Sequence, residues 1–298
     1  MSKFHLVVVT FNRCQLLKKC LDSLIAQSGE QIEKIWVIDN ASTDETEFVM
    51  KSYTASFPSL FTYCKQSENL GGSGGFSLGM KLAFEAGAHW VGLLDDDVLF
   101  APDCLQQLSR FTDKYKCLIG VRESMSGELA EYAALNYDLK NPFRVNPKTA
   151  TIASTYKNRA AMPEVCPIDG ASFEGFFVER SVIEKVGFPF AEYFIFSDDF
   201  DYTIRVRKAG FQAVAVRDAK ITRQLDYKRA GLDSWKTFYI WRNFFVLHFL
   251  YGENVWVRSK PYILSIGLLL LSLIKRKPVD VRAILSSAQK LNKTLQNK

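Results

Sequence analysis

Trp90-Val-Gly-Leu-Leu-Asp-Asp-Asp-Val98 is an apolar run that ends in three consecutive carboxylates, Asp95, Asp96 and Asp97. The apolar part predicts a buried strand. Three like charges at the end of a strand repel one another and lose hydration, so folding alone does not favour them unless a cation meets them. A divalent cation would neutralise these charges and would also attract a phosphate. The stretch therefore predicts a cation site at a strand end, with a solvated turn as the alternative.

Strand-like and helix-like segments alternate on both sides of this stretch through the first 120 residues. The spacing of apolar residues predicts strands at 4–9, 32–38, 61–64, 90–94 and 117–121, and helices at 15–26, 43–56 and 75–86. Ser42 or Thr43 would cap the second helix. This order predicts an α/β fold with a mostly parallel sheet, in which ligands bind at the carboxyl ends of the strands.

Polar or glycine-rich loops follow the first four strands. They are Thr10-Phe-Asn-Arg13, Asp39-Asn-Ala-Ser-Thr-Asp44, Asn69-Leu-Gly-Gly-Ser-Gly-Gly-Phe76 and the acidic triplet. Asp39 could accept hydrogen bonds from a base or a ribose, or it could only hold a turn. The glycines would let the backbone approach a ligand closely. Because no Gly-Lys-Ser/Thr follows, this loop is not a P-loop, and a flexible loop remains the alternative. Together the four loops suggest a nucleotide-sized site.

A second acidic cluster, Ser197-Asp-Asp-Phe-Asp201, opens a helix that the pattern predicts at 198–209. The helix dipole would keep a carboxylate at this end ionised. One of these residues could be a helix cap, but three are more than a cap requires. A carboxylate cluster far along the chain from the first suits a general base. Between the two, residues 122–168 are irregular and polar, which indicates a long insertion near the active face.

The composition limits the classes of protein that the chain could represent. Its 298 residues suffice for one large domain or two smaller ones, and 48% hydrophobic residues argue against disorder. The six cysteines are scattered and form no Cys-x-x-Cys pair, which indicates free thiols in a reducing compartment. The chain runs from Met1 into a strand-like pattern, so we expect no signal peptide.

Charge divides the chain into an acidic part and a basic part. Residues 203–298 hold 19 Lys and Arg against 5 Asp and Glu, a net +14, and residues 1–202 hold 19 against 27, a net −8. A basic region of this kind suggests an anionic partner, either a membrane surface or a nucleic acid. The aromatic residues here lie in apolar runs rather than between basic residues, which disfavours stacking on bases and so disfavours a nucleic acid.

The composition of the sequence changes near Trp235, after which aromatic residues become dense, so we divide the chain into 1–234 and 235–298. Tyr262–Ile274 is a stretch without charge between Lys260 and Lys275-Arg-Lys277. As a helix it would span roughly 20 Å, against about 30 Å of bilayer hydrocarbon. A helix that lies in the membrane interface, with basic residues on lipid phosphates, fits this pattern better than a crossing. A buried core helix is the alternative.

The motifs occur in an order that resembles the bacterial family 2 glycosyltransferases with the GT-A fold, over residues 4–245. The glycine-rich loop is most similar to the galactofuranosyltransferase branch, whose donor is UDP-galactofuranose. The resemblance implies a Rossmann-like, mostly parallel sheet for 1–234 and a helical, membrane-associating region for 235–298. The stretches that carry it are Thr10–Arg13, Asp39–Asp44, Asp95–Asp97, Asp169-Gly-Ala-Ser172, Glu192–Gly210 and Trp241-Arg-Asn243.

The resemblance implies a donor site built from the loops. Asp95 and Asp97 would bind Mn²⁺ or Mg²⁺ against the donor diphosphate, with Asp96 near the ribose or the sugar. Asp39 would contact the nucleobase or the ribose. The other positions that it implies for donor binding are Thr10, Phe11, Arg13, Asn69, Gly71, Gly72, Gly75 and Gly170.

The resemblance also implies the acceptor side. Asp199 matches the catalytic base of the family, Asp198 is its neighbour, and Asp201 would orient the acceptor or the base. In the galactofuranosyltransferase branch a histidine about two dozen residues past the base completes the metal site. Here that position falls on Arg223, which cannot ligate a metal but can clamp a diphosphate.

The implied activity is an inverting transfer of a sugar to a glycan on a membrane lipid, in the synthesis of a cell-surface polysaccharide such as O-antigen, capsule or cell wall. The enzyme would be cytoplasmic and bound peripherally to the inner face of a bacterial membrane. A rhamnosyltransferase that uses dTDP-rhamnose is the first alternative. A sugar nucleotidyltransferase is more remote, because it would leave the carboxylates at 198–201 without a role.

Overall fold

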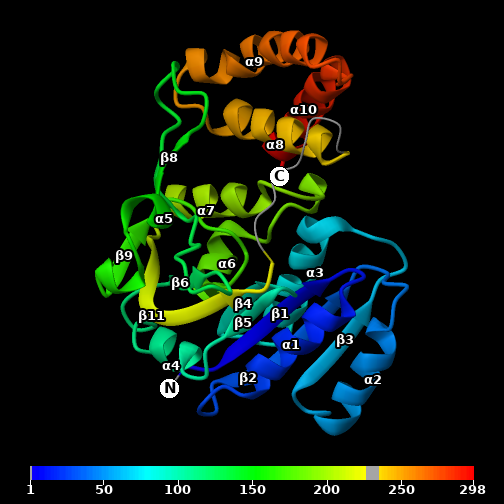
Figure 1. Ribbon diagram of the computed structural model, residues 1–298, viewed down its shortest axis with the longest axis vertical. Coiled ribbons are helices and arrows are strands. Elements are labelled where there is room, and N and C mark those ends of the chain that lie inside the picture. The colour runs from blue at the N-terminus through cyan, green and yellow to red at the C-terminus, as the bar shows by residue number, and fades with distance from the viewer. Residues whose placement is uncertain (1, 226–234) are drawn as a thin grey trace.

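A mixed sheet forms the centre of the computed structural model, which describes residues 2–225 and 235–298 (Figure 1). Its strand order is β3-β2-β1-β4-β10-β6-β11-β5, with β9 paired to β11. The first four strands are parallel, as predicted: β1 (Phe4–Thr10), β2 (Ile32–Asp39), β3 (Phe61–Lys65) and β4 (Trp90–Asp95). The others are β5 (Val98–Phe100), β6 (Cys117–Glu123), β9 (Val165–Ile168), β10 (Phe176–Glu179) and β11 (Ala213–Arg223).

The register of the parallel strands brings their carboxyl ends to one rim. Thr10 of β1 pairs with Asp39 of β2, and Val9 pairs with Asp95 of β4. β10 runs antiparallel between β4 and β6, and β11 runs parallel to β6 but antiparallel to β5. β10 therefore begins at the rim where the parallel strands end, and β11, which runs in the same direction as β1 to β4, ends there.

Helices cover both faces of the sheet because side chains along β1 alternate between them. Val7 and Val9 face one apolar cluster with α3 and α6, whereas Leu6 and Val8 face another with α1 and α2. The helix bounds are α1 (Cys14–Ile25), α2 (Thr46–Ser56), α3 (Gly71–Glu85), α4 (Cys104–Ser109), α5 (Ile152–Thr155), α6 (Arg180–Val186) and α7 (Asp198–Lys208).

α2 and α3 begin elsewhere than predicted. α2 begins at Thr46, and its N-cap is Glu45 without a side-chain cap bond, so the expected cap at Ser42 or Thr43 is wrong. α3 begins at Gly71 rather than at Gly75, so most of the glycine-rich segment is helical. A Cβ at Gly75 would lie 2.6 Å from Cγ1 of Val9. Close packing of α3 on β1 therefore explains this glycine.

The insertion 122–168 is more regular than predicted. It contains the two-stranded sheet of β7 (Ala134–Tyr137) and β8 (Lys148–Thr151), together with α5, the 3₁₀ turn η1 (Arg159–Ala161) and β9. A second 3₁₀ turn, η2 (Ala191–Tyr193), leads toward α7. The loop between β7 and β8 extends toward the C-terminal helices (Figure 1).

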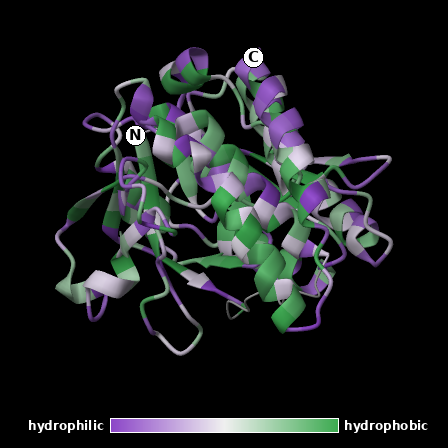
Figure 2. Ribbon diagram, turned by 90° about the horizontal axis from the view of Figure 1, so that it is seen from above, coloured by the Kyte–Doolittle hydropathy of each residue, from purple (hydrophilic) through white to green (hydrophobic). Residues whose placement is uncertain are grey.

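Three C-terminal helices form a layer over α7: α8 (Lys236–Tyr251), α9 (Val255–Ile274) and α10 (Val281–Gln296) (Figure 1). They share an apolar cluster with Ile204 of α7 and with Tyr193. Figure 2 looks down on this layer, with apolar residues along the helices that cross its centre and polar residues along the helix that ends at the C-terminus. The C-terminal region is thus packed on the helix that carries the second acidic cluster.

α9 is longer than the uncharged stretch that predicted it. It has 20 residues, and by length and composition it could cross a membrane. One face is buried, and 33% of its most apolar window is inside the structure. The alternative of a buried core helix is wrong, because the opposite face is exposed. The exposed apolar residues of α9 are Val255, Trp256, Tyr262, Ile263, Ile266, Leu269, Leu270, Leu271, Leu273 and Ile274.

Candidate active site

The acidic triplet lies where β4 ends, and a third carboxylate joins two of its members. Carboxylate oxygens of Asp95, Asp97 and Glu174 all lie within 4.8 Å of one another. Glu174 comes from the loop before β10, whose first residue, Phe176, pairs with Leu93 of β4. Sequence reasoning missed Glu174. The available signal was its place two residues after the Asp169–Ser172 motif.

This carboxylate group has the chemistry of a hard-cation site. Asp97 is 3% exposed, and its Oδ1 has no hydrogen-bond partner among the residues that the structure describes. Burial, and then the charges of Asp97 and Glu174, raise the pKa of Asp95 well above its usual range. All three residues offer oxygen, the donor that Mg²⁺ and Mn²⁺ prefer. The residues present therefore fit a divalent cation, and Asp95, Asp97 and Glu174 would hold it.

Asp96 points away from this group, into the loop after β1. Its Oδ2 accepts a hydrogen bond from Thr10 Oγ1 at 2.7 Å, and its Oδ1 accepts one from Arg13 Nη1 at 3.1 Å. Burial raises the pKa of Asp96 to about 6, and the Arg13 charge opposes this shift. Arg13 also lies 3.6 Å from Asp97, and Phe11 beside it is exposed. The loop after β1 is thus tied directly to the acidic triplet.

The positive charges of two further arginines lie next to the carboxylate of Glu174. Nη1 of Arg122 lies 2.6 Å from Oε2 of Glu174, and Nε of Arg223 lies 3.4 Å from the same oxygen. Arg223 ends β11, opposite Val98 of β5, and the next backbone N–H donates to the Asp97 carbonyl at 2.8 Å. The arginine at the position of the expected histidine therefore lies beside the predicted metal site and next to Glu174.

Asp39 is fully buried at the end of β2. Its Oδ1 accepts the backbone N–H of Ser42 at 2.8 Å, and its Oδ2 accepts the Tyr63 hydroxyl at 2.5 Å. Next to it, Nδ2 of Asn40 donates to the Gly71 carbonyl at 3.0 Å. Asp39 therefore shapes the loop after β2 and ties it to β3, whereas Asn40 connects the loop to the start of α3.

The residues at the start of α3 differ in how closely the rest of the protein surrounds them. Oδ1 of Asn69 accepts the N–H of Gly71 at 2.8 Å. Gly71 has a φ of +71°, and a Cβ there would lie 2.0 Å from the Phe194 carbonyl oxygen, so only glycine fits. A Cβ at Gly72 would meet nothing within 4 Å. Of these glycines, Gly72 is the one that faces open space, where a ligand could approach.

The second acidic cluster forms the first turn of α7. Oδ1 of Asp199 accepts the N–H of Phe200 at 2.7 Å. Burial raises the pKa of Asp199 to about 6, against the opposing effects of this N–H and of the Lys148 charge. Burial, and then the Asp199 charge, raise the pKa of Asp198 to about 8. Both carboxyl groups therefore hold a proton more readily than an exposed aspartate does, and Asp198 more so than Asp199.

Lys148 is a site residue that sequence reasoning missed. It comes from β8, and its Nζ lies 4.3 Å from the centre of the Phe200 ring and donates to the Tyr132 carbonyl at 3.2 Å. Its charge is attracted to both Asp199 and Glu174. Glu174 and Arg122 in turn contribute to the electrostatic environment of Asp199. The two acidic clusters, about a hundred residues apart in sequence, therefore lie near enough to influence each other electrostatically.

Asp201 differs from its two neighbours. Its carboxylate is fully buried and accepts hydrogen bonds from the hydroxyls of Tyr193 at 3.0 Å and Tyr251 at 2.6 Å, and from Arg205 Nε at 2.8 Å. It joins α7 to α8 and lies inside the packing rather than at the rim. Gly170 also has a packing role, because a Cβ there would lie 2.7 Å from the Phe200 ring.

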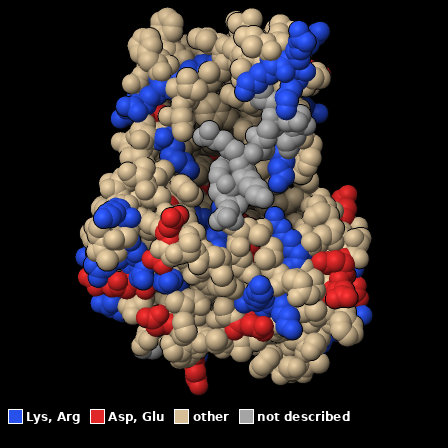
Figure 3. Space-filling model, in the orientation of Figure 1, with Lys and Arg blue, Asp and Glu red and all other residues tan. Residues whose placement is uncertain are grey.

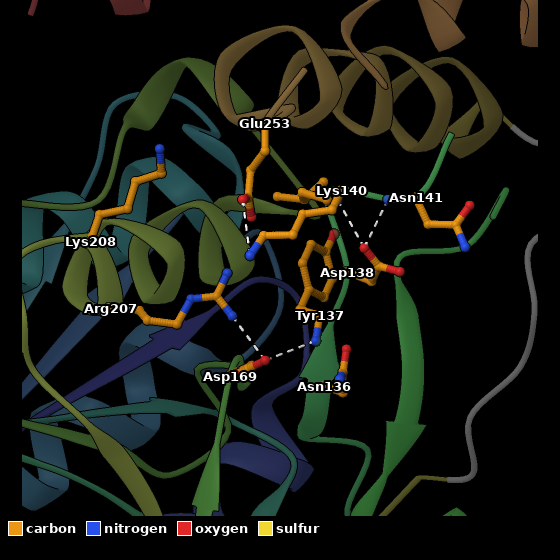
Figure 4. A pocket seen from close by; sticks show the side chains of 10 residues that line it. Asn136, Tyr137, Asp138, Lys140, Asn141, Asp169, Arg207, Lys208 and Glu253 are labelled. Atoms are coloured by element: carbon orange, nitrogen blue, oxygen red, sulfur yellow. Dashed lines mark hydrogen bonds and ion pairs between the residues drawn. The ribbon is translucent and has the colours of Figure 1, made fainter. Parts of the chain in front are cut away.

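A polar pocket of about 890 Å³ lies along α7, and Arg207 and Lys208 of this helix line it (Figure 4). Asp169 accepts the N–H of Tyr137 at 3.0 Å and pairs with Arg207 at 2.9 Å. The ring of Tyr137, which lines the pocket, stacks on Phe200, the residue after Asp199, at 5.1 Å between centroids. The lining residues are Asn136, Tyr137, Asp138, Leu139, Lys140, Asn141, Asp169, Arg207, Lys208 and Glu253.

Comparison with known proteins gives consistent matches. The family model of glycosyl transferase family 2 matches residues 5–185. Galactofuranosyltransferase GlfT1 of Mycobacterium tuberculosis is 30% identical over 221 residues, which cover 72% of this chain and 67% of that protein. GlfT1 of Mycolicibacterium smegmatis is 26% identical over 212 residues, which cover 68% of this chain and 65% of that protein.

Solved structures show the same fold. The structure of GalNAc-T7 with UDP, GalNAc and Mn²⁺ aligns with a TM-score of 0.66 and 11% identity, over 90% of this chain and 51% of that chain. The mannosyltransferase PcManGT from Pyrobaculum calidifontis, with GDP-Man and Mn²⁺, aligns with a TM-score of 0.58 and 15% identity, over 99% of this chain and 83% of that chain. At these identities the likeness concerns the fold.

Proposed function

This chain belongs to glycosyl transferase family 2, and on that premise we propose that it transfers galactofuranose from UDP-galactofuranose to a saccharide on a membrane lipid, in the synthesis of a cell-surface polysaccharide. The observation that carries the proposal is the pairing of two acidic clusters at one site. One cluster has the chemistry to hold a cation and, through it, a diphosphate, and the other contains Asp199, a carboxylate that can accept a proton.

The donor side would be assembled at the rim of the sheet. Asp95, Asp97 and Glu174 would hold Mn²⁺ or Mg²⁺. Such a cation, when bound, neutralises the negative charge that grows on a departing nucleoside diphosphate. Arg223 adds a guanidinium that can pair with diphosphate oxygens, and Arg13 fixes the adjoining loop through Asp96.

The acceptor side would use Asp199 as the general base. Its carboxylate takes the proton from an acceptor hydroxyl while that oxygen bonds to the anomeric carbon and the bond to the diphosphate breaks, which inverts the configuration. A pKa raised to about 6 leaves Asp199 ionised at neutral pH yet more basic than an exposed aspartate. Burial raises the pKa of Asp198, which limits the negative charge beside Asp199.

The C-terminal layer would bind the protein to an anionic membrane surface on the cytoplasmic side. α9 exposes an apolar face, and the basic residues Lys275, Arg276 and Lys277 follow it directly. Figure 3 shows basic side chains gathered at the top of the molecule, over the C-terminal helices. An apolar face with basic residues at its end is the arrangement that binds lipid headgroups and the adjacent acyl region. A site at the membrane would give access to a lipid-linked acceptor.

A donor panel tests this proposal. The purified enzyme, a synthetic lipid-linked saccharide and Mn²⁺ are incubated in parallel with UDP-galactofuranose, UDP-galactopyranose and dTDP-rhamnose, and the products are analysed by mass spectrometry. We expect addition of a hexose from UDP-galactofuranose alone. Addition of a deoxyhexose from dTDP-rhamnose would instead identify a rhamnosyltransferase. Binding of UDP but not dTDP in a thermal-shift assay checks the donor independently of the acceptor.

A further inference from the structure

The five residues before α7, Tyr193 to Ser197, which we call the base loop, have an unusual backbone. Phe194, Phe196 and Ser197 have φ values of 63°, 66° and 66°. Side-chain-bearing residues rarely adopt this left-handed conformation, and they keep it only where surrounding contacts impose it. Because Asp198 and Asp199 follow directly, the conformation of the base loop decides where the Asp199 carboxylate points.

One buried amide holds the base loop. Nδ2 of Asn243, on α8, lies 3.1, 2.7 and 2.8 Å from the carbonyl oxygens of Tyr193, Ile195 and Phe196. Asn243 is 0% exposed, so no solvent competes for these carbonyls at this point. A single donor group therefore gathers three carbonyls of the loop toward one point.

A neighbouring arginine fixes the orientation of that amide. Nε of Arg242 donates to Oδ1 of Asn243 at 2.7 Å, which leaves the NH₂ group facing the loop. Nη2 of Arg242 also donates to the Tyr193 carbonyl at 2.6 Å and to the Glu192 carbonyl at 3.1 Å. Arg242 and Asn243 thus act as one unit, in which the arginine orients the amide and both donate to the loop.

The donor side of the site meets the same loop from the opposite direction. The Phe194 carbonyl accepts the N–H of Ser73 on α3 at 3.1 Å. Gly71, at the start of α3, has space only for hydrogen against this carbonyl. The base loop is therefore held between the glycine-rich start of α3 and the Arg242–Asn243 pair of α8.

We propose that Asn243, oriented by Arg242, is a positioning residue for the transfer reaction: it sets the direction of the Asp199 carboxylate toward the acceptor hydroxyl by holding the base loop, and it does not touch either substrate. This rests on the proposed role of Asp199 as the base. It assigns a function to the C-terminal helical layer, because α8 supplies the contact that orders the catalytic turn.

The test compares Asn243→Ala and Asn243→Asp with the wild type in the full-length protein. We expect kcat to fall about 100-fold in both, the size of effect that a small misplacement of a catalytic group produces. The dissociation constant for UDP with Mn²⁺, measured by calorimetry, should change less than about twofold, because the donor groups lie on other elements. Asn243→Asp keeps the size but cannot donate to the carbonyls, so it should be no better than Asn243→Ala.

A matched control and a second readout separate positioning from general packing. His248→Leu changes another fully buried residue of α8, whose ring nitrogen bonds to the Phe244 carbonyl of the same helix rather than to the base loop, and it should keep kcat within about twofold. In the Asn243 variants the acidic limb of the pH–kcat profile should also move below its wild-type position, because a displaced Asp199 becomes more exposed to water. A purely structural role would leave that limb in place.

The proposal is overturned if Asn243→Asp keeps wild-type kcat, or if kcat and UDP binding fall together in the Asn243 and His248 variants alike. If the Asn243 variants do not fold, Arg242→Met replaces them in the test. This variant keeps Asn243 but removes the hydrogen bond that orients its amide. An unchanged kcat in Arg242→Met would contradict the proposal. Whichever donor the wild type accepts is used for these rates. A wrong donor therefore leaves the inference intact, whereas full activity of Asp199→Asn would remove its premise.

Discussion

Nε of Arg223 lies 3.4 Å from Oε2 of Glu174, beside the end of β4. The resemblance to galactofuranosyltransferases implies a metal-binding histidine at the position of this arginine. In this chain the oxygen donor Glu174 comes from a different loop, and the arginine lies beside it. The cation site that we propose therefore has three carboxylates, whose charge Arg13, Arg122 and Arg223 partly balance, in place of two carboxylates and an imidazole.

Replacing Glu174 by Gln should weaken Mn²⁺ binding at least about tenfold, because the site loses one charged oxygen ligand. Electron paramagnetic resonance of free Mn²⁺ in the presence of UDP measures this without any acceptor. Glu123→Gln is the matched control, since this carboxylate pairs with Arg159 and Lys220 outside the cluster. Equal Mn²⁺ affinity in Glu174→Gln and the wild type would exclude Glu174 as a ligand.

The transfer rate should depend on the ionisation of Asp199. A base must be unprotonated to act, and burial raises the pKa of Asp199 to about 6. We therefore expect kcat/KM to be constant above this pH and to fall about tenfold per pH unit below it. An acidic limb near pH 4, the range of an ordinary aspartate, would contradict the buried position of this carboxylate.

Lys148→Gln should shift that acidic limb to higher pH. The Lys148 charge favours the ionised form of Asp199, so its removal raises the pKa of the base. Lys140→Gln is the control, because Lys140 pairs with Glu253 at the pocket along α7 instead. If the limb stays in place in Lys148→Gln, the lysine does not act on the base.

Neutralising the basic run 275–277 with glutamine should weaken binding to anionic liposomes about 100-fold at low salt. Each basic residue near such a surface contributes about 1 kcal/mol. The effect should shrink as salt is added and should be absent with neutral phosphatidylcholine vesicles. The same change at the exposed residues Lys18, Lys19 and Lys51, far from α9, is the control. Equal loss in both triple variants would mean that the attraction is not located at the end of α9.

Gly79→Ala should destabilise the protein by about 1–3 kcal/mol. A Cβ there would lie 2.2 Å from Cγ1 of Val7 and 3.0 Å from Cγ1 of Ile38, so α3 would have to move away from the sheet. Gly72→Ala on the same helix meets nothing within 4 Å and should be neutral or slightly stabilising. Urea unfolding of the two variants compares them directly, and equal stabilities would contradict the packing role of the glycines.

The sequence predicted the parts of the fold that depend on local patterns. The short apolar runs identified β1 to β4, and the parallel arrangement then placed Thr10, Asp39 and Asp95 at one rim. The carboxylates at 198–201 were correctly placed at a helix start because charge at such an end is a local signal. These predictions needed no knowledge of contacts distant in sequence.

The remaining features depend on contacts that no local pattern contains. Glu174 reaches the acidic triplet only because β10 inserts antiparallel beside β4, and Lys148 reaches Asp199 only through the β7–β8 hairpin. The start of α9 was missed because Lys260 looked like a helix boundary. In the structure this buried lysine is satisfied by the carbonyls of Asn141 and Arg144, each at 2.7 Å.

The most direct test of the account is the activity of Asp199→Asn, measured with UDP binding on the same preparation. Asparagine keeps the shape of the side chain but cannot accept the acceptor proton in the same way. We expect the transfer rate to fall about 10²- to 10⁴-fold, the usual contribution of a general base, while the affinity for UDP with Mn²⁺ stays at the wild-type value. Wild-type transfer by Asp199→Asn would contradict the central claim that this carboxylate activates the acceptor.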